Sequence, residues 1–181
     1  MEFEEKTVQR TEIYQGPIFK VVQDQVELPD GKGQAQRDLI FHNGAVAVIA
    51  ITPENKMILV KQYRKAIEAT SYEIPAGKLE AGEHADPKAA ALRELEEETG
   101  YTGGNWEEIM TIAPNPGVMD NLCHCFYARG VKKASNQHLD ETEDIDVFLC
   151  PKEEVKQMLL RGEFIQALMV APLWKYFSIK D

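Results

Sequence analysis

Basic residues, cysteines and long apolar runs are all scarce in this sequence of 181 residues, and each shortage excludes a class of protein. Lys and Arg number 20 against 30 Asp and Glu, so the net charge of −10 disfavours non-specific binding to nucleic acid or to an anionic membrane. The longest apolar run, Ala45 to Thr52, has the length of a strand and is too short to cross a bilayer. A polyanionic substrate therefore needs a local metal ion or a few placed arginines to receive it.

The three cysteines, Cys123, Cys125 and Cys150, are an odd number without disulfide or zinc spacing. In Cys123-His124-Cys125, neighbouring residues of a strand point to opposite faces, so the three side chains cannot converge on one metal ion. We therefore expect buried free thiols. The first residues, MEFEEKTVQRTEIYQG, lack an apolar signal core, and a reducing cytoplasm is the expected location.

The distribution of strand and helix patterns indicates one mixed α/β domain over residues 1–181. Strand-like segments dominate as far as Arg64, with turns at Asp30-Gly31 and around Asn55, which predicts an antiparallel β region. Further strand patterns are SYEIPAG, EEIMTIA, LCHCFYARG and DIDVFLC. Helical patterns run from Lys152 to Arg161 and from Glu163 to about Phe177. The sequence contains no repeat and no domain linker.

One further helix is predicted by its boundaries and its composition. Asp86 supplies an N-cap, Pro87 suits the first helical position, and KAAALRELEEET consists of strong helix formers. Gly100 is typical of a helix end. The sequence therefore predicts a helix from Pro87 to Gly100.

Three glutamates of this helix are predicted to share one face. Successive residues step by about 100°, so Glu94, Glu97 and Glu98 lie on one arc while Glu96 points away. Arg93 stands one turn before Glu97, at the spacing of an i,i+4 ion pair. A solvated acidic face explains most runs such as ELEEE, whereas three carboxylates on one rigid element are also ligands that Mg²⁺ prefers. The residues around this helix decide between the two.

This helix and the segment before it resemble the Nudix hydrolase box, which reads G, five residues, E, seven residues, then R-E-apolar-x-E-E-x-G-apolar. Gly77, Glu83 and RELEEETGY from Arg93 match this pattern. Nine residues, HADPKAAAL, lie between Glu83 and Arg93 where the family has seven. Two extra residues inside the helix would rotate its acidic face by about 200°, so we expect them in the loop before Pro87.

The resemblance extends over nearly the whole chain to the ADP-ribose pyrophosphatase branch of the family. The similar segments are GAVAVIAI, VKQYR, YEIPAGKLEAGE, PNPGVMDN and HLDETEDIDV. The resemblance implies a Nudix α/β/α sandwich with a mixed sheet, and a homodimer to which the N-terminal antiparallel β region, residues 1–43, contributes. It also implies Mg²⁺-dependent hydrolysis of the pyrophosphate of ADP-ribose or a related nucleoside diphosphate sugar, with two or three ions and with Mn²⁺ as a possible substitute. The products would be a nucleoside monophosphate and a sugar phosphate.

The same resemblance assigns roles by matching positions. The implied metal ligands are the Ala76 carbonyl, Glu94, Glu97 and Glu98. The implied substrate contacts are Arg37, Arg64, Glu73 and Met119. For the two arginines this role is also chemically reasonable, because a guanidinium suits the fork geometry of a pyrophosphate. The implied catalytic residues are Arg93, Glu97, Glu141 and Glu143. Helix glutamates tied to metal are poor bases, so Glu141 is the first candidate for the general base and Glu143 the second.

Two alternatives remain open at this point. One is another Nudix specificity, such as GDP-mannose, a dinucleoside polyphosphate or a capped RNA, although the acidic charge disfavours RNA. Asn121 stands where the branch often has an acidic residue, so other nucleoside diphosphate sugars compete with ADP-ribose. The other alternative is a non-catalytic module that senses a nucleotide. Such a module need not keep its metal glutamates, whereas this chain has all three.

Overall fold

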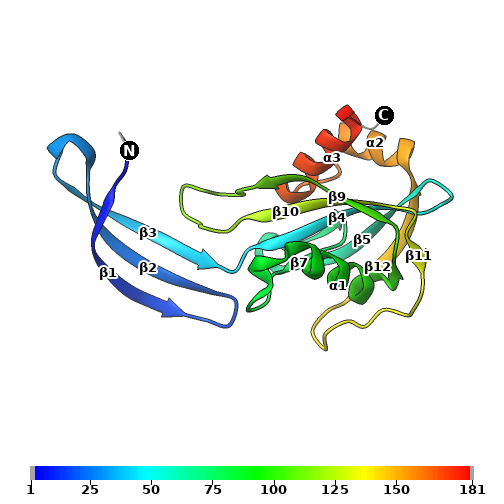
Figure 1. Ribbon diagram of the computed structural model, residues 1–181, viewed down its shortest axis with the longest axis horizontal. Helices are drawn as coiled ribbons and strands as arrows, with labels where there is room; N and C mark the ends of the chain where they lie inside the picture. Colours follow the sequence, from blue (N-terminus) through cyan, green and yellow to red (C-terminus); the bar gives the residue numbers. More distant parts are fainter. Residues whose placement is uncertain (1–2, 180–181) are drawn as a thin grey trace. The chain divides into compact units, whose positions relative to one another are not determined.

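The computed structural model describes residues 3–179, which form two compact units (Figure 1). The first unit contains the chain up to Gly44 together with Ala113–Leu122. The second contains Ala45–Ile112 and the chain from Cys123 onward. The interpretation of the chain as a single domain stays a prediction.

The first unit is built on a three-stranded antiparallel sheet in the order β1-β2-β3. A 3-10 turn at Pro29–Gly31 joins the second strand to the third, with Asp30 at a φ of 60° and Gly31 at 68°. The predicted antiparallel region and its turn are confirmed. The strands are β1 (Lys6–Gln15), β2 (Phe19–Glu27) and β3 (Gln34–His42).

Asp24 is the polar centre of this sheet, because it is a carboxylate covered almost completely by its neighbours. Arg10 donates to both of its oxygens, at 2.7 Å from Nε and 2.6 Å from Nη2, and the Thr7 hydroxyl donates at 3.1 Å. These bonds, that of Arg10 first, hold the pKa of Asp24 below its usual value. All ten residues of β1 are exposed, so this cluster and the ring contact between Tyr14 and Phe19 attach β1 to β2 with little apolar burial.

The second unit contains a mixed sheet in the order β12-β5-β4-β10-β9, with β6 beside β5 and β7 beside β4. The pair β4 and β10 is parallel, and every other pair in the sheet is antiparallel. A short ribbon pairs β8 with β11. The strands are β4 (Ala45–Ile51), β5 (Lys56–Arg64), β6 (Ala69–Glu73), β7 (Ala76–Lys78), β8 (Tyr101–Thr102), β9 (Asn105–Ile112), β10 (Cys123–Arg129), β11 (Lys132–Lys133) and β12 (Ile145–Pro151).

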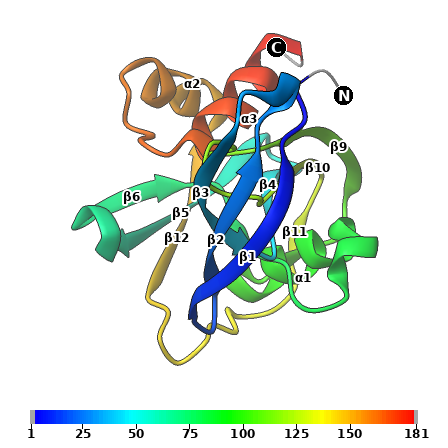
Figure 2. The same ribbon diagram turned by 90° about the vertical axis from the view of Figure 1, so that its left-hand side faces the viewer.

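Helices cover both faces of this sheet (Figures 1 and 2). One face carries α1 (Pro87–Thr99), and the other carries α2 (Lys152–Leu160) and α3 (Ala167–Ile179). The central strand β4 is apolar throughout because alternate side chains enter the two cores, Val46 and Val48 beneath α1, Ala47 and Ile49 beneath α2 and α3. The predicted α/β/α sandwich with a mixed sheet is confirmed.

Two predicted boundaries in the second unit are wrong. The last helix begins at Ala167 rather than Glu163, because Gly162 turns the chain at a φ of 75° and the segment after it buries Phe164 in the core. The predicted strand SYEIPAG is divided into β6 and β7 at Ile74 and Pro75. Among residues 3–179, no helix is long and apolar enough to span a membrane.

Candidate active site

The helix α1 begins and ends where its sequence predicts. The Asp86 carboxylate accepts the N–H of Ala89 at 3.2 Å, and Gly100 closes the helix at a φ of 70°. The helix is continuous from Pro87, and the residues before it form a 3-10 turn at Glu83–Ala85. The segment in which we expect the two extra residues is therefore outside the helix, and the acidic face of the helix is intact.

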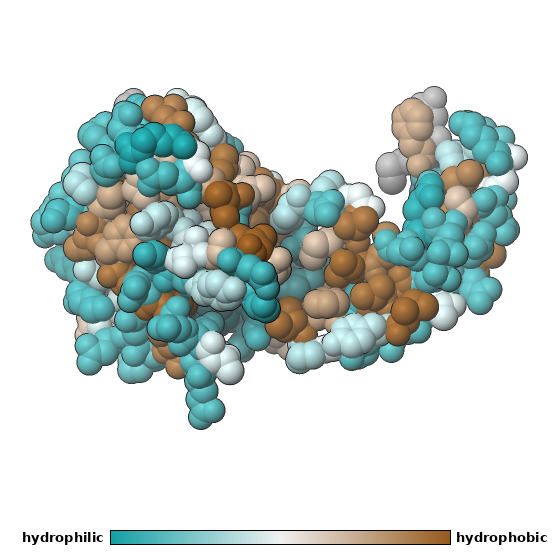
Figure 3. All heavy atoms as spheres, turned by 180° about the vertical axis from the view of Figure 1, so that it is seen from behind, coloured by the Kyte–Doolittle hydropathy of each residue, from teal (hydrophilic) through white to brown (hydrophobic). Residues whose placement is uncertain are grey.

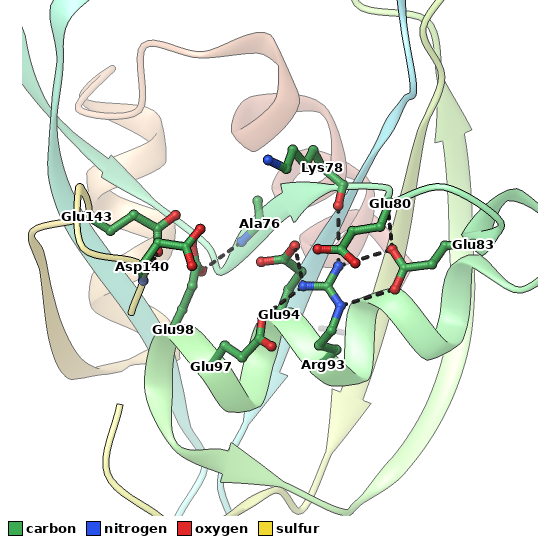
Figure 4. Close-up of polar contacts among 10 residues, drawn as sticks. All are labelled: Ala76, Lys78, Glu80, Glu83, Arg93, Glu94, Glu97, Glu98, Asp140 and Glu143. Atoms are coloured by element: carbon green, nitrogen blue, oxygen red, sulfur yellow. Dashed lines mark hydrogen bonds and ion pairs between the residues drawn. The ribbon is translucent and has the colours of Figure 1, made fainter. Parts of the chain in front are cut away.

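Glu94 and Glu98 lie against the short strand β7 (Figure 4). Glu98 is 4% exposed, and its carboxylate accepts the backbone N–H of Ala76 at 3.0 Å. The carboxylate of Glu94 lies directly over Gly77, where a Cβ atom would come within 2.1 Å of the Glu94 carboxyl carbon. A side chain at position 77 would therefore displace the Glu94 carboxylate.

The surroundings of the two carboxylates disfavour their ionised form, by burial first and by neighbouring negative charge second. Burial raises the pKa of Glu98 to about 8, against the opposing hydrogen bond from Ala76, and the charges of Glu94 and Glu143 raise it further. Burial likewise raises the pKa of Glu94 to about 7, although Arg93 opposes this, and Glu143 again adds to it. A divalent cation would relieve this repulsion, and a donor set of carboxylates without imidazole or thiolate suits a hard cation such as Mg²⁺.

Arg93 organises the remaining acids of the box. Its guanidinium donates to both oxygens of Glu83 at 3.1 Å and to Glu97 at 2.8 Å, and it pairs with Glu94 at 3.0 Å. The predicted i,i+4 pair with Glu97 is confirmed, and Glu96 is exposed as predicted. Glu83 thus reaches the helix through Arg93 in spite of the insertion.

Three of the four metal ligands assigned by resemblance lie together, and the fourth lies apart from them. Glu94, Glu98 and Ala76 lie together, whereas Glu97 is directed toward Arg93 and its side chain is 42% exposed. Within residues 3–179, no three Asp, Glu, His or Cys side chains are grouped as a ready-made coordination shell.

Arg64 and Glu73, both assigned to the substrate, pair with each other. Arg64 on β5 donates to both oxygens of Glu73 on β6, through Nε at 2.7 Å and through Nη2. Glu73 is fully buried. This pairing raises the pKa of Arg64, as do the charges of Glu98 and Glu143, so the guanidinium lies beside the carboxylate cluster.

Two glutamines that the sequence did not indicate complete the environment of Glu73. Gln62 donates to one carboxylate oxygen at 3.4 Å, and Gln166, the residue before α3, donates to the other. The same Gln166 amide donates to the Ser71 hydroxyl at 3.2 Å. Neither glutamine belongs to a sequence motif, so only the three-dimensional structure could identify them as partners of Glu73.

The acidic loop before β12 brings Glu143 close to the helix carboxylates (Figure 4). The loop is closed by two hydrogen bonds between Asp140 and Glu143, at 2.9 Å from the Glu143 N–H and 3.2 Å to the Glu143 carboxylate. The charge of Glu143 acts on both Glu94 and Glu98. Glu141 is an exposed residue of the same loop.

The two other residues assigned to the substrate, Arg37 and Met119, belong to the first unit. Arg37 pairs with Glu5 at 3.0 Å and 2.6 Å, and Met119 is bridged to Ile40. Asn121 is also in this unit, and its buried side-chain oxygen has no hydrogen-bond partner in the part of the chain that the structure describes.

Comparisons with known proteins support the resemblance that the box indicated. The sequence matches the "NUDIX domain" family over residues 41–171 and the "Nucleoside diphosphate sugar hydrolase N-terminal domain" family over residues 5–40. It is 40% identical to the ADP-ribose pyrophosphatase of Bacillus subtilis (strain 168) over 179 residues, which cover 98% of this chain and 95% of that protein. It is 47% identical to the methanol dehydrogenase activator of Bacillus methanolicus over 158 residues, 87% of this chain and 84% of the activator. The crystal structure of an ADP compounds hydrolase has the same fold, with a TM-score of 0.80 at 20% identity, over 97% of this chain and 93% of that one.

Proposed function

Since this chain belongs to the Nudix domain family, we propose that it hydrolyses the pyrophosphate bond of ADP-ribose or a related nucleoside diphosphate sugar. The products are a nucleoside monophosphate and a sugar phosphate. The observation that carries this proposal is the pair formed by the partly buried Glu94 and the buried Glu98, with Glu143 and Arg64 beside it. Such a cluster combines a place for a hard cation with a guanidinium for the phosphates. It also argues against a module that only senses a nucleotide.

Glu94, Glu98 and the Ala76 carbonyl would hold Mg²⁺, or Mn²⁺ in its place, with Glu97 as a further ligand once it leaves Arg93. When bound, two or three such ions would neutralise charge on the phosphates and lower the pKa of the attacking water. The chain's own residues then orient the reactants. Arg64 donates to the phosphoryl oxygens, while its two hydrogen bonds to Glu73 fix the orientation of the guanidinium. Arg93 fixes the box acids around the helix.

The hydrolytic step needs a base for the water proton, and Glu143 is the better candidate. Its charge acts on Glu94 and Glu98, which supports this choice over Glu141. Water attacks one phosphorus, the bond from that phosphorus to the bridging oxygen breaks, and the water proton passes to Glu143. The bridging oxygen leaves with the other phosphate group.

A phosphate-release assay tests the proposal. A panel of ADP-ribose, other nucleoside diphosphate sugars, GDP-mannose and a dinucleoside polyphosphate is incubated with the chain, with a phosphatase added to free phosphate from the products. We expect turnover of ADP-ribose or another nucleoside diphosphate sugar with Mg²⁺ or Mn²⁺, and its loss in excess EDTA. Full turnover in EDTA, or no turnover of any nucleoside diphosphate sugar, would contradict the proposal.

A homodimer is part of the proposal, and the surface of the first unit supports it. Apolar side chains are exposed along its sheet, with Val8, Ile13, Tyr14 and Ile18 each more than half exposed. Figure 3 shows brown, apolar atoms gathered on the surface of the first unit, on the right of the view. Contiguous apolar surface of this kind marks sites of protein association.

A reducing, cytoplasmic location is likewise proposed, and the state of the cysteines supports it. All three thiols are free and buried, and the sulfurs of Cys123 and Cys125 lie 4.0 Å apart. The hydrogen bond to Cys123, together with burial, raises the pKa of Cys125 and keeps this thiol protonated.

A second candidate function is stimulation of a dehydrogenase, which is favoured by the 47% identity to the methanol dehydrogenase activator. Methanol oxidation by a methanol dehydrogenase is measured with added wild-type chain and with the Glu98→Gln variant. Stimulation by the wild type alone would connect the two functions through hydrolysis. No stimulation by either protein would exclude this candidate.

A further inference from the structure

Gln137 lies in the segment between β11 and β12 and uses both hydrogens of its amide group. One donates to the backbone carbonyl of Glu98 at 2.8 Å, and the other donates to the backbone carbonyl of Ile145 at 3.0 Å. The side-chain amide is partly buried. It therefore joins the last turn of α1 to the first residue of β12.

This bridge closes the two ends of the acidic loop. The loop runs from residue 138 to residue 144 and contains Glu143. At its start, the backbone N–H of His138 donates to the Glu97 carbonyl at 2.8 Å. At its end, Ile145 enters β12. Gln137 thus connects both ends of the loop to the helix that carries the metal glutamates.

The two hydrogen bonds of Gln137 satisfy backbone carbonyl groups. The last carbonyls of a helix have no partner within the helix, and Gln137 supplies one to Glu98 as Lys133 does to Thr99, at 2.6 Å. An amide can donate twice without adding charge. A carboxylate here would face two carbonyl oxygens and add negative charge next to the cluster.

We propose that Gln137 is a positioning residue for the hydrolysis, because it holds the acidic loop where Glu143 reaches the attacking water. The inference rests on the proposed function. Inside the loop, the bonds between Asp140 and Glu143 shape the turn but do not attach it to the helix. Without the bridge the loop can open locally, and a displacement of about 1 Å at a catalytic group is enough to lower a rate about 100-fold.

The test compares Gln137→Met, which keeps the length of the side chain and removes both donors, with Asn136→Ala at the exposed neighbouring position. For Gln137→Met we expect kcat for the best nucleoside diphosphate sugar to fall about 10- to 100-fold. KM and the Mn²⁺ dissociation constant should change less than about threefold, because the cation ligands lie on α1 and β7. Asn136→Ala should behave as wild type. An equal loss of Mn²⁺ affinity would overturn the proposal, since Gln137 would then act through the helix.

A double-mutant cycle with Glu143→Gln distinguishes a loss of the position of Glu143 from a general disturbance of the active site. If Gln137 acts by placing Glu143, the double variant should be no slower than Glu143→Gln alone. Losses that multiply would overturn the proposal.

Hydrogen exchange gives a readout that does not depend on activity, and it also serves if Gln137→Met folds poorly, with Gln137→Glu as the second variant. Amides of residues 138–144 should exchange faster in either variant while those of α1 keep their protection. Unchanged exchange in the loop would overturn the inference. If the wild type hydrolyses no nucleoside diphosphate sugar, the proposed function fails, and loop exchange still decides whether Gln137 anchors the loop.

Discussion

Gly77 shows how one absent side chain shapes the candidate site. A Cβ atom at this position would lie 2.1 Å from the Glu94 carboxyl carbon, and the backbone of Gly77 does not require glycine for its φ angle. We therefore expect Gly77→Ala to push the flexible end of Glu94 aside. Mn²⁺ affinity should fall by about tenfold or more while the melting temperature changes by only a few degrees, as measured by titration and calorimetry.

Gly117→Ala is the matched control for this substitution. A Cβ atom at Gly117 would approach nothing closer than 3.9 Å, and its φ is also outside the left-handed region. The control should keep wild-type affinity and activity. If Gly77→Ala also binds Mn²⁺ normally, Glu94 does not act as a ligand from the position seen in the structure.

The division of work between helix and loop is tested by three conservative substitutions. Glu98→Gln should weaken Mn²⁺ binding and catalysis together, because Glu98 on α1 belongs to the carboxylate cluster that faces β7. Glu143→Gln should leave Mn²⁺ affinity nearly unchanged while kcat falls about 10² to 10⁴-fold, the usual contribution of a general base. Glu141→Gln is the neighbouring control, with kcat close to that of the wild type. Wild-type kcat in both loop variants would place the base elsewhere.

At the scale of single residues, the sequence could predict the site residues that belong to a motif. It could not predict residues that only hydrogen-bond to a site residue from a distant part of the chain. The spacing of Glu94 and Glu98 on a helix is local, so it could be calculated from the helical step. Gln166 contacts Glu73 across 93 residues of sequence, and no spacing rule predicts such a contact. The preference for Glu143 over Glu141 likewise depends on how the loop folds back.

At the scale of elements, local signals predicted boundaries well and long-range packing did not. The boundaries of α1 follow from Asp86 and Gly100, whose side chain and conformation act on the adjacent turn. The start of α3 was displaced because burial of Phe164 favours an extended segment. The strand β1 carries no alternating pattern, since all ten of its residues are exposed, and its pairing with β2 cannot be deduced from composition.

The N-cap of α1 provides a test at this scale. Asp86→Ala removes the side-chain acceptor for the Ala89 N–H and should cost about 1 kcal/mol of unfolding free energy, or about 2–4 °C in Tm. Asp86→Ser should restore most of this, because serine also caps helices. Activity at 25 °C should stay near that of the wild type in both variants, since the carboxylates lie in the other half of the helix. An alanine variant as stable as the wild type would show that packing alone fixes the start of α1.

At the scale of the whole molecule, the fold class could be predicted because the order of strand and helix patterns indicates a mixed α/β sandwich and the residues of the box resemble one family. The strand order β12-β5-β4-β10-β9 could not, because it joins segments that are far apart in the sequence. The parallel pairing of β4 with β10 also depends on how the two cores are covered. Association between chains is a further property that burial within one chain does not determine.

The dimer is the prediction that belongs to this scale. Ile13 on β1 is 58% exposed on the sheet of the first unit, and Ile165 before α3 is 56% exposed in the second unit. If the apolar sheet of the first unit forms the interface, Ile13→Glu buries a charge there and should dissociate the dimer. Ile165→Glu introduces the same charge at the same exposure and should have no effect. Sedimentation equilibrium at micromolar concentration should give twice the 20.5 kDa chain mass for the wild type and Ile165→Glu, and a shift toward 20.5 kDa for Ile13→Glu. A wild-type protein that sediments at 20.5 kDa would refute the dimer, and dissociation by Ile165→Glu alone would move the interface to the second unit.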